Sequence, residues 1–161
     1  MTKTEFRQRR SSPRLKSFDY AGPYAYSVSC CTRERRPHLS HEDTVDAILD
    51  YLEEISGELG FSVYAYCFMP DHLHLLLVGT ENSSLAKFMT LFKQRTNYAF
   101  KKEHGCSLWQ RSYYDHILRR EEALRDVALY IFDNPVRKGL VAQYRDYPFS
   151  GSLVFDAKEI D

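Results

Sequence analysis

The segment FSVYAYCFMPDHLHLLLVG, residues 61–79, predicts the centre of the fold. Residues 61–69 and 72–79 are rich in the aromatic and aliphatic side chains that are typical of strands. Pro70 and Asp71 separate the two runs, and this pair favours a turn while it interrupts a strand. We therefore expect an antiparallel hairpin at this place in the chain.

Strand-like sequences also lie on both sides of this hairpin. Residues 24–32, YAYSVSCCT, are rich in aromatic and β-compatible residues and end in the charged segment RERRPH. Residues 107–118, SLWQRSYYDHIL, are expected to form a fourth strand. The hairpin thus becomes the middle of a larger sheet.

Three other segments carry apolar residues at helical spacing. The first begins at Ser40, which forms a capping-box pattern with Asp43, and ends before Gly60. The other two helices are expected over about 84–105 and over 121–134, where Pro135 follows. The chain therefore alternates between strands and helices.

The predicted order is strand, helix, strand, strand, helix, strand, followed by the third helix. This is the split βαβ arrangement of ferredoxin-like folds, so we predict an α+β protein, βαββαβ, with an antiparallel sheet. Helices should cover one face and leave the other face for a site. We expect a basic, flexible N-terminal arm over 1–18, a single domain over 19–155 and a C-terminal tail over 156–161.

Length and composition indicate a folded soluble protein. The chain has 161 residues, 43% of them hydrophobic, which is enough for one core. No apolar run approaches the ~20 residues that cross a bilayer, so no membrane association is expected. The four cysteines lack CxxC spacing, which favours neither a zinc knuckle nor a disulfide framework. We predict a cytoplasmic protein.

Two histidines in the second half of the hairpin are candidates for metal binding. His72 and His74 are two residues apart, so in a strand they project from the same face, while Leu73 points to the other. Two imidazoles at this spacing can share one metal ion, but a site needs a third ligand. A hydrogen-bonded histidine pair without a metal remains the alternative at this point.

A tyrosine on the third predicted helix has a polar residue one helical turn further on. Residues at i and i+4 share a helical face, which pairs Tyr130 with Asn134. Both fall at the edge of the apolar stripe, where they can reach the open face of the sheet. Taken alone, Tyr130 could equally be an amphipathic tyrosine at the core edge, and Asn134 an ordinary helix-ending residue before Pro135.

The charge distribution matters more than the net charge, which is zero. Acidic residues concentrate in 41–60, whereas the second half of the chain is basic. Cations beside aromatic residues on the second helix suit single-stranded DNA, although such lysines often only solvate a helix. The candidate DNA-binding residues are Lys87, Lys93, Arg95, Lys101, Arg119 and Arg120.

Several blocks in order carry a family resemblance: MPDHLH, LWQRSYYDHILR, YIFDNPVRKGLV and YPFSGS. With its His-hydrophobic-His core and downstream tyrosine, the chain resembles the single-tyrosine HUH transposases of bacterial insertion sequences. It is most similar to the REP-associated tyrosine transposases, over roughly residues 20–152. Four ordered blocks are far more specific than the histidine pair alone.

The resemblance implies an enzyme that nicks and rejoins single-stranded DNA near hairpin-forming repeats or imperfect palindromes. It implies that His72 and His74 bind Mg²⁺ or Mn²⁺, that Asn134 matches the third ligand, and that Tyr130 is the nucleophile that forms a 5′-phosphotyrosine. Direct coordination by Asn134 stays open, because part of the wider family has the longer Gln there. The proton acceptor for Tyr130, a role for His116, and the choice between a monomer and a homodimer also stay open.

Two alternatives to a strand transferase are a hairpin-binding protein and an unrelated metalloenzyme. The first is a noncatalytic, domesticated protein that binds DNA hairpins, and intact candidate site residues argue against it. The second is an unrelated metalloenzyme on a cupin-type barrel. Such barrels consist of many short strands, which the long amphipathic helices of this chain contradict.

Overall fold

The computed structural model describes residues 22–119 and 123–160. The expected arm over 1–18 and the side chain of Arg120 lie outside the described residues. No helix in this described part is long and apolar enough to cross a bilayer. The helices and strands are β1 (Ala25–Cys31), α1 (Glu42–Leu59), β2 (Ser62–Met69), β3 (His72–Val78), α2 (Leu85–His104), β4 (Tyr114–Ile117), α3 (Leu124–Phe132), α4 (Asn134–Arg137) and β5 (Ser150–Gly151), with short 3-10 turns at Arg33–Arg35, His38–Ser40 and Tyr144–Asp146.

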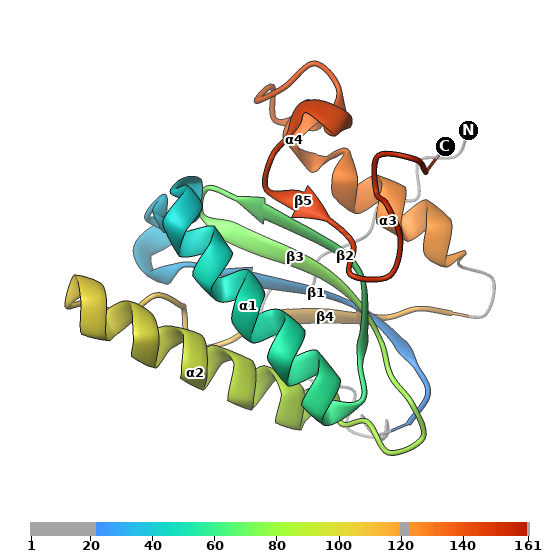
Figure 1. The fold of residues 1–161 in the computed structure, drawn as a ribbon, viewed down its shortest axis with the longest axis horizontal. Coiled ribbons are helices and arrows are strands. Elements are labelled where there is room, and N and C mark those ends of the chain that lie inside the picture. The colour runs from blue at the N-terminus through green and yellow to red at the C-terminus, as the bar shows by residue number, and fades with distance from the viewer. Residues whose placement is uncertain (1–21, 120–122, 161) are drawn as a thin grey trace.

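The strands form one antiparallel sheet in the order β4-β1-β3-β2-β5 (Figure 1). Strands β2 and β3 are the predicted hairpin, and its register places Met69 opposite His72. The order β4-β1-β3-β2, with α1 and α2 as the crossover helices, confirms the ferredoxin-like prediction. Strand β5 was not predicted, because two residues are too short to show a period-2 pattern.

The main hydrophobic core lies between the sheet and the pair α1 and α2, which Figure 1 shows on one side of the sheet. Alternation along β3 directs Leu73, Leu75 and Leu77 into this core, where each is fully buried. The period of the strand therefore sends His72 and His74 to the opposite face.

The second face of the sheet is only partly open, in contrast to the expectation of an uncovered face. Helix α3 packs Val127 and Ile131 against Cys67 of β2 and Leu76 of β3, in a smaller hydrophobic cluster. The C-terminal segment joins this cluster through residues that include Ile160. Helix α3 and the segment after α4 thus cover the β2 side of the face that carries the histidines (Figure 1).

A serine side chain caps the start of α2 but not the start of α1. Ser84 caps α2, since its Oγ accepts from the backbone N–H of Lys87 at 3.3 Å. The capping box predicted at Ser40 is wrong. His41 occupies the N-cap position of α1, and Ser40 Oγ instead donates to the carbonyl of Pro37 at 2.7 Å within the preceding turn.

Two element ends also differ from the sequence prediction. The fourth strand is only Tyr114–Ile117, because the residues before it bend around the end of β1 and pair there through one bridge, Thr32 to Trp109. The third helix ends at Phe132 and not at Asn134. Pro135 lies in the first turn of α4, where its missing N–H removes no intrahelical hydrogen bond.

Candidate active site

The two histidines lie side by side on the face of the sheet that α3 partly covers. In the sheet register His74 lies between Ser29 of β1 and Cys67 of β2, and His72 lies between Cys31 and Met69. The ring centroids of the two histidines are 4.6 Å apart, with the rings nearly perpendicular. The predicted shared face is therefore present.

Each imidazole is held through its Nδ1 atom. Nδ1 of His72 lies 2.7 Å from Oδ1 of Asp71, and Nδ1 of His74 lies 2.7 Å from Oγ of Ser29. A carboxylate only accepts, so a neutral His72 donates its Nδ1–H to Asp71 and keeps its lone pair on Nε2. Both rings can therefore offer Nε2 to a metal, which is the usual arrangement of metal-binding histidines.

Burial keeps both imidazoles in the form that binds metals. Burial, together with the charges of His72 and Arg137, lowers the pKa of His74 to about 3. Burial also lowers the pKa of His72, against the opposing effect of its hydrogen bond to Asp71. At neutral pH the two rings are uncharged, as metal coordination requires.

Asp71 is itself held in place by the loop that follows β1. Nε of Arg35 lies 3.0 Å from Oδ2 of Asp71, and the backbone N–H of Thr32 donates to the Asp71 carbonyl at 2.9 Å. Glu34 and Arg35 have left-handed φ angles of 58° and 55°, a conformation that costs a non-glycine residue strain. Burial alone would raise the pKa of Asp71, but the His72 hydrogen bond and the charges of His72 and Arg35 lower it.

Tyr130 and Asn134 both contact Arg137, a residue that was not among the site residues predicted from the sequence. Tyr130 is 41% exposed on α3, and the guanidinium carbon of Arg137 lies 4.0 Å from its ring centroid. Nη2 of Arg137 donates to Oδ1 of Asn134 at 2.8 Å, and Nη1 pairs with Asp133 at 3.2 Å. Asn134 is buried, and its Nδ2 donates to the carbonyl of Ile131 at 3.2 Å.

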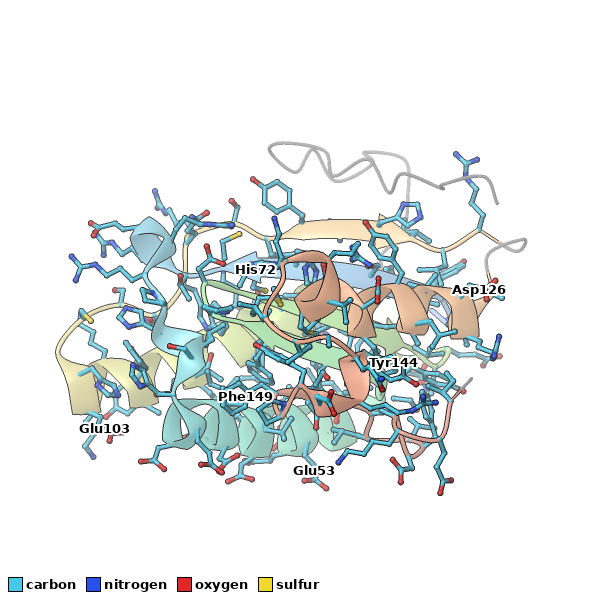
Figure 2. The ribbon with its side chains drawn as sticks, turned by 90° about the horizontal axis from the view of Figure 1, so that it is seen from above. Glu53, His72, Glu103, Asp126, Tyr144 and Phe149 are labelled. Atoms are coloured by element: carbon cyan, nitrogen blue, oxygen red, sulfur yellow. The ribbon has the colours of Figure 1, made fainter. Side chains whose placement is uncertain are left out.

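Helices α3 and α4 bring this group to the histidine face. Arg137 is close enough for its charge to lower the pKa of His74, and Lys138 acts on the pKa of His72 in the same way. Figure 2 shows His72 beside the C-terminal helical segment, while Glu53 and Glu103 point outward from α1 and α2. The structure therefore places Tyr130 and Asn134 against Arg137, on helices that pack on the sheet face carrying the histidines.

The donor set fits a divalent metal only if the third ligand is an amide, a water or the substrate. In residues 22–119 and 123–160 no group of three or more His, Cys, Asp and Glu side chains is placed to hold a metal ion. His72 and His74 supply two imidazole nitrogens, and Asn134 Oδ1 is the candidate amide oxygen. That oxygen now accepts from Arg137, so direct coordination requires this hydrogen bond to be exchanged.

His116 lies on β4, on the same face of the sheet and two strands from β3. It pairs with Ser27 of β1 in the register, two residues from the row that contains Ser29 and His74. Its side chain is exposed. The register therefore places His116 on the open part of the candidate face.

The predicted DNA-binding cations differ in their exposure and in their contacts within the protein. Lys87, Lys101 and Arg119 are exposed. Nζ of Lys93, in contrast, donates to the carbonyls of Gln110 at 2.6 Å and Ser112 at 3.2 Å, and burial lowers its pKa. Arg95 pairs with Glu54 at 3.5 Å and Glu58 at 3.2 Å on α1. The charged groups of Lys93 and Arg95 thus contact oxygen atoms of the protein itself.

Comparison with known proteins shows the family of the chain. The family described as "Transposase IS200 like" matches residues 23–134. A protein of Haemophilus influenzae named as a REP-associated tyrosine transposase is 31% identical over 126 residues, which cover 66% of this chain and 72% of the relative. The REP-associated tyrosine transposase of Escherichia coli K12 is 30% identical over 102 residues, covering 60% of this chain and 58% of the relative.

A solved structure shares the fold. The structure of a REP-associated tyrosine transposase bound to a REP hairpin superposes with a TM-score of 0.73, at 22% identity, over 88% of this chain and 82% of the other. The family match includes both histidines, Tyr130 and Asn134. The expectation of an HUH-type tyrosine transposase is thereby confirmed, and the chain belongs to the IS200-like transposase family, with REP-associated tyrosine transposases among its relatives.

Proposed function

We propose that this protein cuts and rejoins single-stranded DNA next to hairpin-forming repeats, with Tyr130 as the nucleophile. The observation that carries the proposal is the contact of Arg137 with both Tyr130 and Asn134, next to the sheet face that carries His74. The relatives at 31% and 30% identity are both named for association with REP sequences, which supports a repeat-derived hairpin as the DNA partner.

His72 and His74, through Nε2, and Asn134, through Oδ1, would hold one Mg²⁺ or Mn²⁺. Such a metal supplies Lewis-acid polarisation and orientation of the scissile phosphodiester. The hydrogen bonds of Nδ1 to Asp71 and Ser29 support this role, since they would leave Nε2 of both rings for the metal. The neutral state of the imidazoles keeps their lone pairs available.

Tyr130 would attack phosphorus through its phenol oxygen. A bond forms between Oη and phosphorus, the bond from phosphorus to the 3′ oxygen breaks, and the leaving 3′ oxygen gains a proton as the phenol loses one. The 5′-phosphate stays on the tyrosine, so attack by another 3′-OH can reverse the step and rejoin DNA. Arg137 would contribute positive charge beside the phosphate oxygens, where negative charge develops in the transition state.

The exposed cations are proposed to position the DNA through its phosphates. Lys87 and Lys101 on α2 and Arg119 after β4 are exposed, and Arg120 is proposed with them. Lys93 and Arg95 would contribute indirectly, because their charged groups already contact carbonyl and carboxylate oxygens of the protein.

The experiment is a nicking assay on a labelled single strand that contains a hairpin from a REP-type repeat, with Mg²⁺ or Mn²⁺. The wild-type protein should give a nicked product that is absent with EDTA and absent in Tyr130→Phe and His74→Ala. A gel shift should show that Tyr130→Phe still binds the hairpin. Tyr24→Phe is the matched control, since Tyr24 is 40% exposed at the start of β1.

Two outcomes would reject this function. Nicking by Tyr130→Phe at the wild-type rate would exclude Tyr130 as the nucleophile. Tight hairpin binding by the wild type without any nicking, under either metal, would replace the transferase with a noncatalytic hairpin-binding protein. The same assay at increasing protein concentration reports whether the active species is a monomer or a homodimer.

A further inference from the structure

An open hollow lies between α2 and the segment 107–111, outside the group around Arg137. Its volume is about 770 Å³, which falls in the range of small-molecule sites. Helix α2 supplies one wall, and the segment that runs from α2 toward β4 supplies the other. A second hollow adjoins it and shares Arg33 and Lys101 with it. Unlike the first hollow, the second is also lined by the acidic Glu34.

The lining of this hollow is strongly basic. Arg33, Lys93, Lys101 and Arg111 line it, and none of the described lining residues is Asp or Glu. The chain as a whole has 22 basic and 22 acidic residues, so this segregation is local. Among the described residues no ion pair neutralises Arg33, Lys101 or Arg111. A ligand with several negative charges is therefore favoured.

The hollow also presents a flat aromatic surface. Tyr98 is 71% exposed, the highest exposure among the large hydrophobic side chains in the described part of the chain. Its ring stands on a rigid helix and lines the hollow. Base stacking on an exposed aromatic ring is the usual way in which proteins hold unpaired nucleotides without reading their sequence.

The wall opposite Tyr98 is fixed before any ligand arrives. Nε1 of Trp109 donates to Oγ1 of Thr96 at 2.8 Å, and the backbone N–H of Leu108 donates to Oδ1 of Asn97 at 2.7 Å. Lys93 adds its two hydrogen bonds to carbonyls of the same segment. Three residues of α2 thus hold the segment at a constant distance from the helix, which lowers the entropic cost of binding.

The hollow lies at the same end of the sheet as the histidine pair. The backbone N–H of Gln110 donates to the carbonyl of Cys31, and Arg33 N–H donates to the carbonyl of Leu108, both at 2.9 Å. Cys31 pairs directly with His72 in the sheet, at the ordinary strand spacing of about 4.8 Å. A DNA strand that passes over His72 therefore reaches the hollow once it rounds the end of β1.

We infer that this hollow binds unpaired nucleotides of the DNA strand on which the protein acts, with one base stacked on Tyr98 and flanking phosphates on Arg33, Lys101 and Arg111. The inference rests on the proposed function for the identity of the polyanion as DNA. The hollow lies away from the reacting phosphate and binds the single-stranded part of the substrate. The paired stem of a hairpin cannot bind this site in the same way, because its bases are stacked on one another and are not available to stack on Tyr98.

The experiment measures binding of a fluorescent single-stranded oligonucleotide to the full chain by anisotropy, without added metal. Tyr98→Ala should weaken binding on the order of 10-fold or more, whereas Tyr98→Phe keeps the ring and should bind as the wild type does. Arg111→Ala should also weaken binding and should flatten the dependence of log K on log salt concentration by about one phosphate contact. Tyr98→Ala should leave that slope unchanged. Tyr24→Ala is the control for loss of an exposed ring.

A second readout locates the contact directly. Strands with a single 5-iododeoxyuridine should photocrosslink to the peptide that contains Tyr98, and a matched duplex should neither crosslink there nor compete. Equal affinity of Tyr98→Ala and wild type, equal loss in Tyr98→Phe, or equal competition by the duplex would each overturn the inference. Binding at Tyr98 without nicking would reject the proposed chemistry and keep this site, and absence of any DNA binding would reject both.

Discussion

The guanidinium group of Arg137 lies over the ring of Tyr130, with 4.0 Å between Cζ and the ring centroid, and the same group donates to Asn134. Removing it should affect the reaction far more than the fold. Arg137→Ala is expected to slow single-turnover nicking about 100-fold, the usual cost of one transition-state donor, with hairpin binding almost unchanged. The loss of the exposed cation–π contact should cost only about 0.5–1 kcal/mol of stability.

The matched control for Arg137 is Arg145. Its guanidinium lies 5.1 Å from the ring centroid of Tyr144 and hydrogen-bonds the carbonyls of Lys158 and Ile160. Arg145→Ala should lower stability by a similar or larger amount and leave nicking unchanged. Equal effects of the two substitutions on nicking would assign Arg137 a structural role only.

Asp71→Asn should weaken metal binding while the fold is preserved. An amide at this position accepts from Nδ1 of His72 more weakly and no longer attracts Arg35, so His72 is oriented less well. Loss of such a partner typically costs 10- to 100-fold in metal affinity. Mn²⁺ titration followed by electron paramagnetic resonance measures this. Arg36→Ala is the control, because Arg36 forms an ion pair with the exposed Glu34 in the same loop.

Tyr147→Phe should change the alkaline limb of the stability curve. The hydroxyl of Tyr147 donates to the buried carbonyl of Phe68, and burial, with the charge of Cys67, raises the pKa of Tyr147. The folded state therefore keeps a proton that the unfolded state loses above about pH 10. The contribution of Tyr147 is present below that pH, and above it falls by up to about 1.4 kcal/mol per pH unit.

Urea unfolding at pH 8 and pH 11 measures this effect. Tyr147→Phe should be less stable than wild type by about 1–2 kcal/mol at pH 8, because the Phe68 carbonyl loses its donor. The difference between the two proteins should shrink at pH 11. A difference that is constant with pH would show that Tyr147 ionises alike in both states.

The four cysteines should differ sharply in reactivity. Cys30, Cys31 and Cys67 are buried, whereas Cys106 is exposed. Burial raises the pKa of Cys30 and Cys67 to about 12, so these thiols stay protonated and unreactive at neutral pH. A thiol reagent should therefore modify one cysteine rapidly in the native protein and none in Cys106→Ser. Rapid reaction of two or more cysteines would contradict the packing of the sheet.

Local sequence patterns predicted most of the fold, because the strand alternation and the turn signal are clear in the central hairpin. The alternation in β3 gave the histidine face, and the Pro70 and Asp71 turn gave the hairpin. The ferredoxin-like order followed from the order in which strand-like and helix-like segments alternate along the chain. The position of α3 on the second face could not be predicted in this way, since the amphipathic stripe of a helix does not say which apolar surface it covers.

The candidate site was predicted only in part, because its supporting contacts join distant parts of the chain. Asp71 was recognised as a turn residue, but its partner Arg35 is 36 positions away. Arg137 lies near a helix end, where a cation is ordinary. Lys93 and Arg95 were predicted to bind DNA, but their charged groups contact oxygen atoms of the protein. The sequence does not reveal which of these two partners a charge faces.

The proposed function requires DNA to become attached to Tyr130, and mass spectrometry of the protein–DNA adduct detects that attachment. The protein is incubated with a hairpin-containing single strand and Mn²⁺, denatured, and digested with nuclease and trypsin. We predict a nucleotide-phosphate mass on the peptide that contains Tyr130, with no adduct in Tyr130→Phe. Attachment to any other residue, or an adduct that persists in Tyr130→Phe, would contradict the account.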